Sequence, residues 1–227
     1  MIWQKGIVVF VGIVLFSLFH YSPVQAADFL KYFTFSEANV LKIWKEKLYK
    51  GKVDYKIIKG PGQDFIQATA KNAASGIYYE FPDKEFYNPT SKPFISWKWK
   101  VNRFPKKEDE KVEDFAARIY VIFPAKVFIF SKCIEYVWDD KLAQGTRTKS
   151  SLSSRIQIFV LQNGKKEGWI QEERNVVEDY KQAFGEDEVD DKIGAIAFMS
   201  DSDDSETEGQ SLFDEIKIGY SHSILKK

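Results

Sequence analysis

Strict alternation of apolar and polar side chains marks two segments in the middle of the chain. Residues 94–101 (FISWKWKV) place Ile, Trp, Trp and Val on one side and Ser, Lys and Lys on the other. Residues 114–123 (DFAARIYVIF) alternate in the same way, with a markedly apolar first face. A period of two predicts β-strands with one face in the core. We therefore expect the tryptophans of the first segment to be core residues.

Further strands are predicted between strong turn signals. Gly60-Pro61-Gly62 separates two short strand-like runs, and Asn163-Gly164 predicts a hairpin between two later ones. The additional runs are residues 55–58, 64–70, 76–81, 134–138, 155–162, 168–177, 192–200 and 213–220. Many short strands with little helix predict a mainly β protein, an antiparallel β-sandwich of the jelly-roll type. A closed barrel is the main alternative.

Two segments have a helical pattern. Residues 36–48 space their apolar side chains like one helical face, although a strand beginning near Trp44 is an alternative. Residues 178–185 predict one or two helical turns ending at Gly185. The expected fold is thus a β-sandwich with one or two short helices.

The N-terminus has the pattern of a secretory signal peptide. Lys5 precedes an uncharged apolar run from residue 7 to 19, and Ala26 closes a small-residue cleavage site. The run is shorter than the about 20 apolar residues of a membrane span. We expect cleavage after Ala26, which leaves residues 27–227 as a single exported domain in the periplasm or outside the cell. An uncleaved anchor is the alternative.

Composition excludes several function classes. Residues 27–227 contain 32 basic and 33 acidic side chains, so there is no basic excess for nucleic acid. Cys133 is the only cysteine, which excludes an internal disulfide and favours an inert buried thiol. His222 is the only histidine of that part and lies near the C-terminus. A zinc site or a histidine-based nucleophile is therefore not expected.

Five separated motifs resemble one protein family. They are WKWKV (97–101), DFAARIYVIF (114–123), YVW (136–138), ERNVVEDYKQAFG (173–185) and GAIAFMSDSDDS (194–205). In this order they are similar to the DUF3047 family of exported bacterial proteins, whose function is unassigned. The resemblance implies a β-sandwich similar to galactose-binding and carbohydrate-binding modules. It implies no established substrate and no catalytic residue.

The chain departs from the family pattern at three places. Glu113-Asp114 replaces an Asp-Asp pair, and Phe213-Asp-Glu-Ile replaces Tyr-Gly-Asp-Ile. The pattern T-D-x-D-N-T-G becomes residues 200–206, where Asp204 and Glu206 replace the asparagine and the glycine. Loss of that glycine puts a tight family-like turn at 204–206 in doubt.

The acidic stretch SDSDDSETE, residues 200–208, has two interpretations. Asp201, Asp203 and Asp204 could share a structural calcium ion, since calcium prefers carboxylate oxygens. The spacing does not fit an EF-hand, because Glu206 stands where a glycine is required. A solvated acidic loop is the more common origin of such runs. No other cofactor is expected.

Polar faces of the predicted strands carry the ligand-binding hypothesis. Arg118 is unusual in its apolar segment, and it either pairs with a carboxylate such as Asp114, Glu173 or Asp179, or binds a ligand. Aromatic side chains at strand ends could stack on sugar rings. The candidate ligand-binding residues are Arg118, Tyr120, Lys98, Arg174 and Trp138.

The sequence predicts an exported protein that binds a saccharide or another polar polymer of the cell envelope without transforming it. A polysaccharide hydrolase or lyase on the same sheet face is one alternative, with Glu80, Glu135 and Glu173 as first suspects. A protein-interaction module is the other. Ligand identity and oligomeric state do not follow from the sequence.

Overall fold

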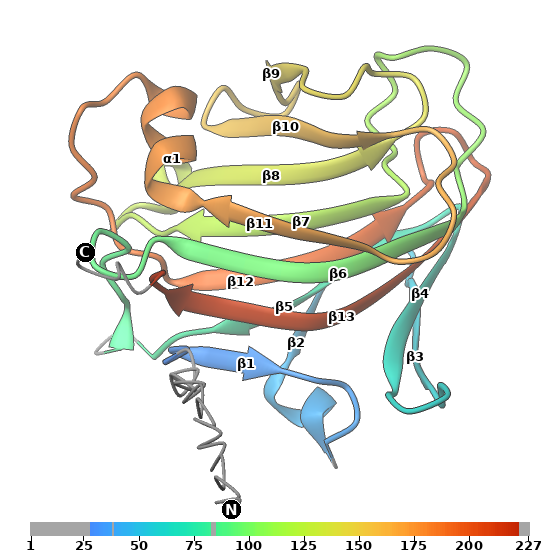
Figure 1. The fold of residues 1–227 in the computed structure, drawn as a ribbon. Coiled ribbons are helices and arrows are strands. Elements are labelled where there is room, and N and C mark those ends of the chain that lie inside the picture. Colours follow the sequence, from blue (N-terminus) through green and yellow to red (C-terminus); the bar gives the residue numbers. More distant parts are fainter. Residues whose placement is uncertain (1–27, 38, 83–84, 223–227) are drawn as a thin grey trace, which may run out of the picture.

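The computed structural model describes residues 28–37, 39–82 and 85–222, and the predicted signal peptide lies outside this part. Two β-sheets pack face to face and one α-helix lies at one end (Figure 1). The predicted β-sandwich is confirmed, while its jelly-roll connectivity stays a prediction. In the described residues no helix is both long and apolar enough to cross a membrane.

The first sheet has seven strands, which we call the seven-stranded sheet. In order across the sheet they are β2 (Lys45–Lys50), β5 (Ala74–Glu80), β12 (Ala195–Asp201), β7 (Ala117–Phe123), β8 (Lys132–Asp139), β10 (Ile156–Asn163) and β9 (Arg147–Lys149). All neighbours are antiparallel except β8 and β10, which run parallel.

The second sheet has six strands, all paired antiparallel. They are β11 (Ile170–Asn175), β6 (Phe94–Arg103), β13 (Glu208–Tyr220), β4 (Phe65–Lys71) and β3 (Asp54–Ile58), with β1 (Lys31–Phe33) on the far end of β13. The turn at Gly60-Pro61-Gly62 joins β3 to β4 as predicted. The predicted hairpin at Asn163-Gly164 is wrong, because β10 and β11 belong to different sheets.

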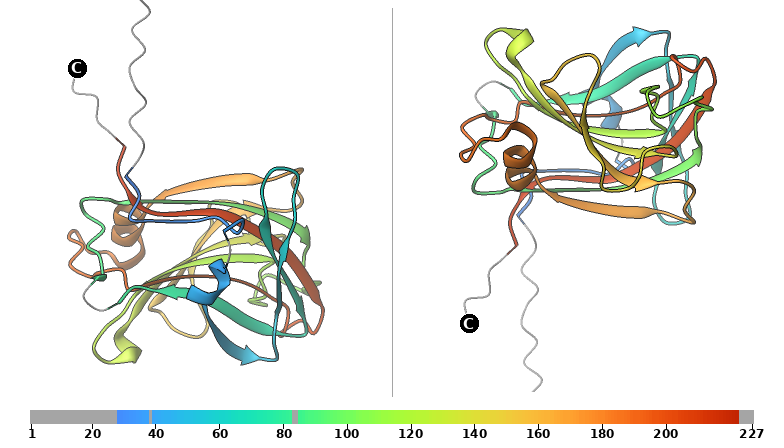
Figure 2. Two further views of the ribbon diagram at one scale, coloured as in Figure 1. Left: turned by 90° about the horizontal axis from the view of Figure 1, so that it is seen from below. Right: turned by 90° about the horizontal axis from the view of Figure 1, so that it is seen from above.

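The helical prediction holds at one place and fails at the other. Helix α1 spans Val176–Phe184; the Asn175 side chain accepts hydrogen bonds at its start and Gly185, with φ 68°, ends it. Figure 2 shows α1 at one end of the sandwich in both views. In place of one helix, the described part of residues 36–48 contains a short 3-10 helix, Val40–Ile43, followed by β2. The alternative, a strand beginning near Trp44, is confirmed. Trp44 is already extended, because its ring packs into the core between the sheets.

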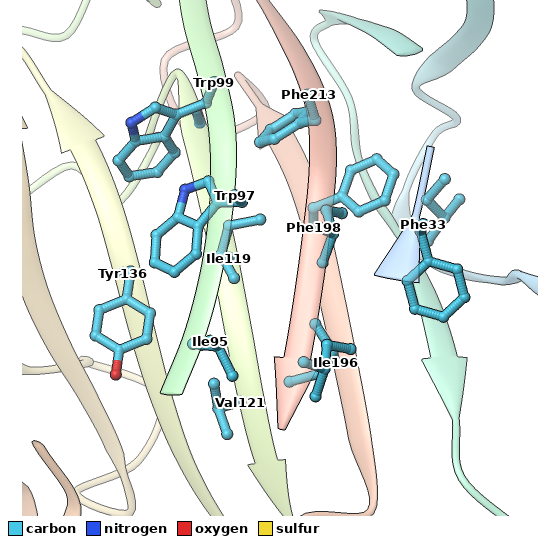
Figure 3. Packing of buried hydrophobic residues seen from close by; sticks show 14 of the residues in the cluster. Phe33, Ile95, Trp97, Trp99, Ile119, Val121, Tyr136, Ile196, Phe198 and Phe213 are labelled. Atoms are coloured by element: carbon cyan, nitrogen blue, oxygen red, sulfur yellow. The ribbon is translucent and has the colours of Figure 1, made fainter. Parts of the chain in front are cut away.

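The core between the sheets consists mainly of aromatic and β-branched side chains. Trp97 and Trp99 of β6 are buried, as predicted from their alternation, and they belong to one cluster with Tyr136 of β8 and Phe198 of β12 (Figure 3). The ring centroids of Trp97 and Tyr136 are 5.3 Å apart. Burial of such rings supplies most of the stability of a sheet sandwich.

A smaller apolar cluster covers part of the opposite face of the seven-stranded sheet. Phe115 packs there on Val137, Ile158 and Val160, and all four are buried. Phe115 belongs to the connection between β6 and β7, residues 104–116, which we call the β6–β7 connection. The face that points away from the main core, the outer face, is therefore covered over β8 and β10.

Candidate functional site

Arg118 is the centre of a buried polar network on the outer face. Its Nε donates to Asp201 Oδ1 at 2.9 Å, its Nη2 donates to Asp201 Oδ2, and its Nη1 donates to Glu135 Oε1 at 2.7 Å. Nη2 also donates to the backbone carbonyl of Glu113, and the guanidinium lies 4.6 Å from the Phe115 ring centroid. Arg118 is 7% exposed. The guanidinium charge is thus paired with carboxylates of the protein itself, so it is not available to a ligand.

The partners of Arg118 are not those named from the sequence. Asp114, Glu173 and Asp179 were the carboxylates expected to pair with it, whereas the structure supplies Asp201 and Glu135. β12 and β8 are the two neighbours of β7 in the sheet, so side chains on the same face of these strands converge. Sequence distance hides this arrangement, since Asp201 lies 83 residues from Arg118.

Two buried carboxylates share this single guanidinium. Burial raises the pKa of Asp201 to about 7 against the opposing charge of Arg118, and burial also raises the pKa of Glu135. One carboxylate therefore lacks a counter-ion of its own, so the folded protein favours a proton on the network.

The stability of the protein should therefore fall as the pH rises. An unfolded Asp has a pKa of about 3.9, so the contribution of this proton is complete below about pH 4 and is lost as the pH rises through about 7. We expect the free energy of unfolding to fall by on the order of 2 kcal/mol between pH 5 and 8. Urea denaturation at four pH values measures it. Asp201→Asn should flatten the profile, and the exposed control Glu167→Gln should not. Equal profiles for the wild type and Asp201→Asn would contradict the assignment.

The acidic stretch forms a turn held by protein groups. Asp114 is fully buried and accepts hydrogen bonds from the backbone of Asp204 at 3.2 Å and of Ser205 at 2.7 Å. Glu206 takes the left-handed conformation, with φ 52°, where the family pattern has glycine. The tight turn is thus kept, at the conformational cost of a non-glycine residue in that region.

Three carboxylates of this region are close enough to share a cation. One oxygen each from Asp114, Asp201 and Asp203 lies within 4.8 Å of the others. Asp114 takes the place that the sequence analysis gave to Asp204. Both oxygens of Asp114 and both of Asp201 already accept hydrogen bonds from protein donors. A calcium ion would have to compete with these donors for its ligands.

The other candidate ligand-binding residues do not share the surface of Arg118 and Tyr120. Lys98 lies on β6 of the second sheet and pairs with Glu215 at 2.5 Å. Arg174 lies on β11 and pairs with Asp179. Trp138 is fully buried and its Nε1 donates to the Gly164 carbonyl at 2.9 Å. The expected rim position of Trp138 is corrected, because its ring belongs to the core.

The remaining titratable suspects also have protein partners. Glu173 accepts from the Tyr220 hydroxyl at 2.6 Å and lies 2.8 Å from exposed His222. Burial raises the pKa of the half-buried Cys133 thiol well above its ordinary value, which disfavours the reactive thiolate.

Strand register assigns the side chains of the open part of the outer face. Ile77 on β5, Phe198 on β12 and Ile119 on β7 lie in the main core, so their neighbours along each strand face outwards. Ala197 pairs directly with Tyr78 on one side and with Tyr120 on the other. The two tyrosines are half-buried and flank a small residue. We call Tyr78, Ala197 and Tyr120 the tyrosine row. Only Tyr120 was a candidate from the sequence, because the pairing of its strand with those of Ala197 and Tyr78 was unknown.

Tyr120 is held by the Arg118 network. Its hydroxyl lies 3.3 Å from Arg118 Nη1 and 3.2 Å from the sulfur of Met199. Burial raises the pKa of Tyr120 well above its ordinary value, so the hydroxyl stays protonated at neutral pH. The network thus fixes one aromatic ring of the open face.

A hollow of about 440 Å³ lies elsewhere, between the edge strands β2 and β3. Its walls include Trp44, Val53, Tyr55 and Ile77. Because Ile77 faces the core, the hollow opens on the opposite side of β5 from the tyrosine row. The two features are therefore separate.

A comparison with protein families finds a match over most of the chain. A family model described as "Protein of unknown function (DUF3047)" matches residues 42–217. The matched range contains the Arg118 network and the tyrosine row. No curated protein matches the chain.

Proposed function

We propose a binding function for this chain, which belongs to the DUF3047 family. The protein is exported, and its outer sheet face binds a saccharide or another polar cell-envelope ligand without transforming it. The signal-peptide pattern of residues 1–26 supports export to the periplasm or beyond. Its ligand is a polymer or oligomer rich in hydroxyl groups.

The tyrosine row is the observation that carries the proposal. Neighbouring strands lie about 4.8 Å apart, so Tyr78 and Tyr120 stand about 10 Å apart with Ala197 between them. Tyrosine combines an apolar ring face with a hydroxyl, which suits the C–H faces and hydroxyl groups of a sugar. Ala197 is only 8% exposed, so the two tyrosines, rather than the alanine between them, supply the accessible ring surface. The row therefore supports a flat ligand lying across the strands.

Arg118 has a supporting role in this proposal. Its donors are directed to Asp201, Glu135 and the Glu113 carbonyl. A ring held in place before binding loses less conformational entropy when the ligand arrives. Arg118 is thus a positioning residue for Tyr120 rather than a ligand contact.

Calorimetric titration of the purified protein with cellotriose, chitotriose and trigalacturonate tests the function. We expect one of these to bind, and Tyr120→Ala and Tyr78→Ala each to weaken it by tenfold or more at unchanged fold, judged by circular dichroism. Tyr32→Ala, a partly exposed tyrosine on β1 of the other sheet, is the matched control.

Two results would contradict the proposal. One is the absence of binding to every saccharide together with a stable protein partner, which would favour the interaction module. The other is the appearance of reducing ends or unsaturated products with time, which would favour the hydrolase or lyase.

A further inference from the structure

We propose that the ligand of the outer face is anionic, an acidic saccharide whose carboxylate binds Lys47. This inference rests on the proposed function and adds the charge of the ligand to it. It follows from the position of β2 at the edge of the seven-stranded sheet and from the charges along the open face.

Strand register places Lys47 on the same face as the tyrosine row. Lys45 pairs with Tyr78 and Lys47 pairs with Gly76, so both lysines share the outer side of the sheet with Tyr78. Lys47 is the diagonal neighbour of Tyr78, a relation of about 7–8 Å that long side chains can span. The ammonium of Lys47 can therefore reach a sugar ring that packs on Tyr78.

Gly76 brings the Met199 side chain close to β2. Gly76 has no side chain, and the next strand places Met199 opposite it. A Cβ built on Gly76 would lie 3.6 Å from both the Cβ and the sulfur of Met199, so the methionine packs against this buried glycine. Met199, which also contacts the Tyr120 hydroxyl, therefore forms the surface between Lys47 and Tyr120.

The acidic side chains of this face do not neutralise Lys47. Asp201 and Glu135 are 4% and 2% exposed and are bonded to Arg118. Glu80 pairs with Lys45 on the same face. Among the described residues Lys47 makes no ion pair, and it is exposed. The accessible charge left on the open face is therefore positive.

The ring surface continues beside this charge. Tyr49 follows Lys47 by two residues on β2 and is 67% exposed. An exposed tyrosine beside an unpaired lysine and a half-buried tyrosine favours a ligand with both ring faces and a negative group. An acidic sugar has both in each unit, whereas an acidic peptide lacks the rings.

Binding of three probes at low and high salt tests the inference. We expect trigalacturonate to bind at least tenfold more tightly than neutral cellotriose or pentaglutamate at 50 mM salt. Its advantage over cellotriose should shrink at 500 mM salt, because screening acts on the charged contact. Lys47→Gln should weaken the binding of trigalacturonate about tenfold and leave the binding of cellotriose unchanged. Lys149→Gln, an exposed lysine on the far edge strand β9, is the matched control and should change neither.

Each alternative result has a definite meaning. Equal binding of trigalacturonate and cellotriose, insensitive to Lys47→Gln, would overturn the anionic ligand but leave saccharide binding standing. Equal binding of pentaglutamate and trigalacturonate would overturn the acidic saccharide in favour of an acidic peptide. Failure of all three probes would overturn the inference, and failure of chitotriose as well would overturn the proposed function with it.

Discussion

Arg118→Met should destabilise the protein by about 3–5 kcal/mol, because it leaves two carboxylates buried without their cation. Asp201 and Glu135 are 4% and 2% exposed, so water cannot take the place of the lost guanidinium. Chemical denaturation measures the loss, which for a chain of this size corresponds to roughly 10 °C in Tm. The stability of Arg118→Lys should fall between that of the wild type and that of Arg118→Met. Lysine keeps the positive charge but loses the bidentate contact with Asp201.

Two variants separate this explanation from a simple packing effect. The triple variant Arg118→Met, Asp201→Asn, Glu135→Gln removes the uncompensated charges and should recover part of the loss. Arg103→Met is the control, because Arg103 pairs with Glu208 on the exposed surface at 2.6 Å; we expect less than about 1 kcal/mol there. A loss below about 1 kcal/mol for Arg118→Met would contradict the buried network.

Lys107→Met should lower the free energy of unfolding by a similar amount, about 3–5 kcal/mol. Lys107 holds the β6–β7 connection against the outer face. Lys107 Nζ lies 2.6 Å from Asp139 Oδ1, and the two side chains are 0% and 1% exposed. The ammonium also lies 4.7 Å from the Phe115 ring centroid. Close approach makes this a strong ion pair although no well-aligned hydrogen bond joins the two groups within the described residues. Its loss leaves Asp139 charged and buried.

Hydrogen exchange gives this prediction a local readout. Lys107 lies in the β6–β7 connection, so exchange in residues 108–116 should rise more than in the core strands. Asp139→Asn added to Lys107→Met should restore stability, because an amide oxygen can still accept from the Leu142 backbone. The neighbouring exposed Lys106→Met should cost less than about 0.5 kcal/mol. A loss that is equal at Lys106 and Lys107 would contradict the buried pair.

These two anchors explain why the outer face is only partly open. The β6–β7 connection is fastened by Lys107 at β8 and by Asp114 at the 203–205 turn, and Phe115 fills the space between. The half over β2, β5 and β12 has no such cover among the described residues. The tyrosine row and Lys47 lie there, which places the proposed site beside a rigid edge.

The sequence by itself determined the strands and their inner faces. The alternation at residues 94–101 and 117–123 requires one face in the core, because a shift by one residue would expose every apolar side chain. Phe115 departs from this pattern, because it precedes β7 and packs on the outer face. Trp97 and Trp99 are buried for that reason. Gly185 likewise ends α1 where expected, since its left-handed φ favours glycine. These are local constraints that each segment carries within itself.

Only the tertiary structure decided which strands are neighbours. Asn163-Gly164 has the composition of a hairpin turn, yet the chain there crosses from one sheet to the other. The pairing of Arg118 with Asp201 and Glu135 and the row from Tyr78 to Tyr120 both depend on β12 lying between β5 and β7. Strand order minimises the exposed apolar area of the whole sandwich, and that sum over distant segments has no local signature in the sequence.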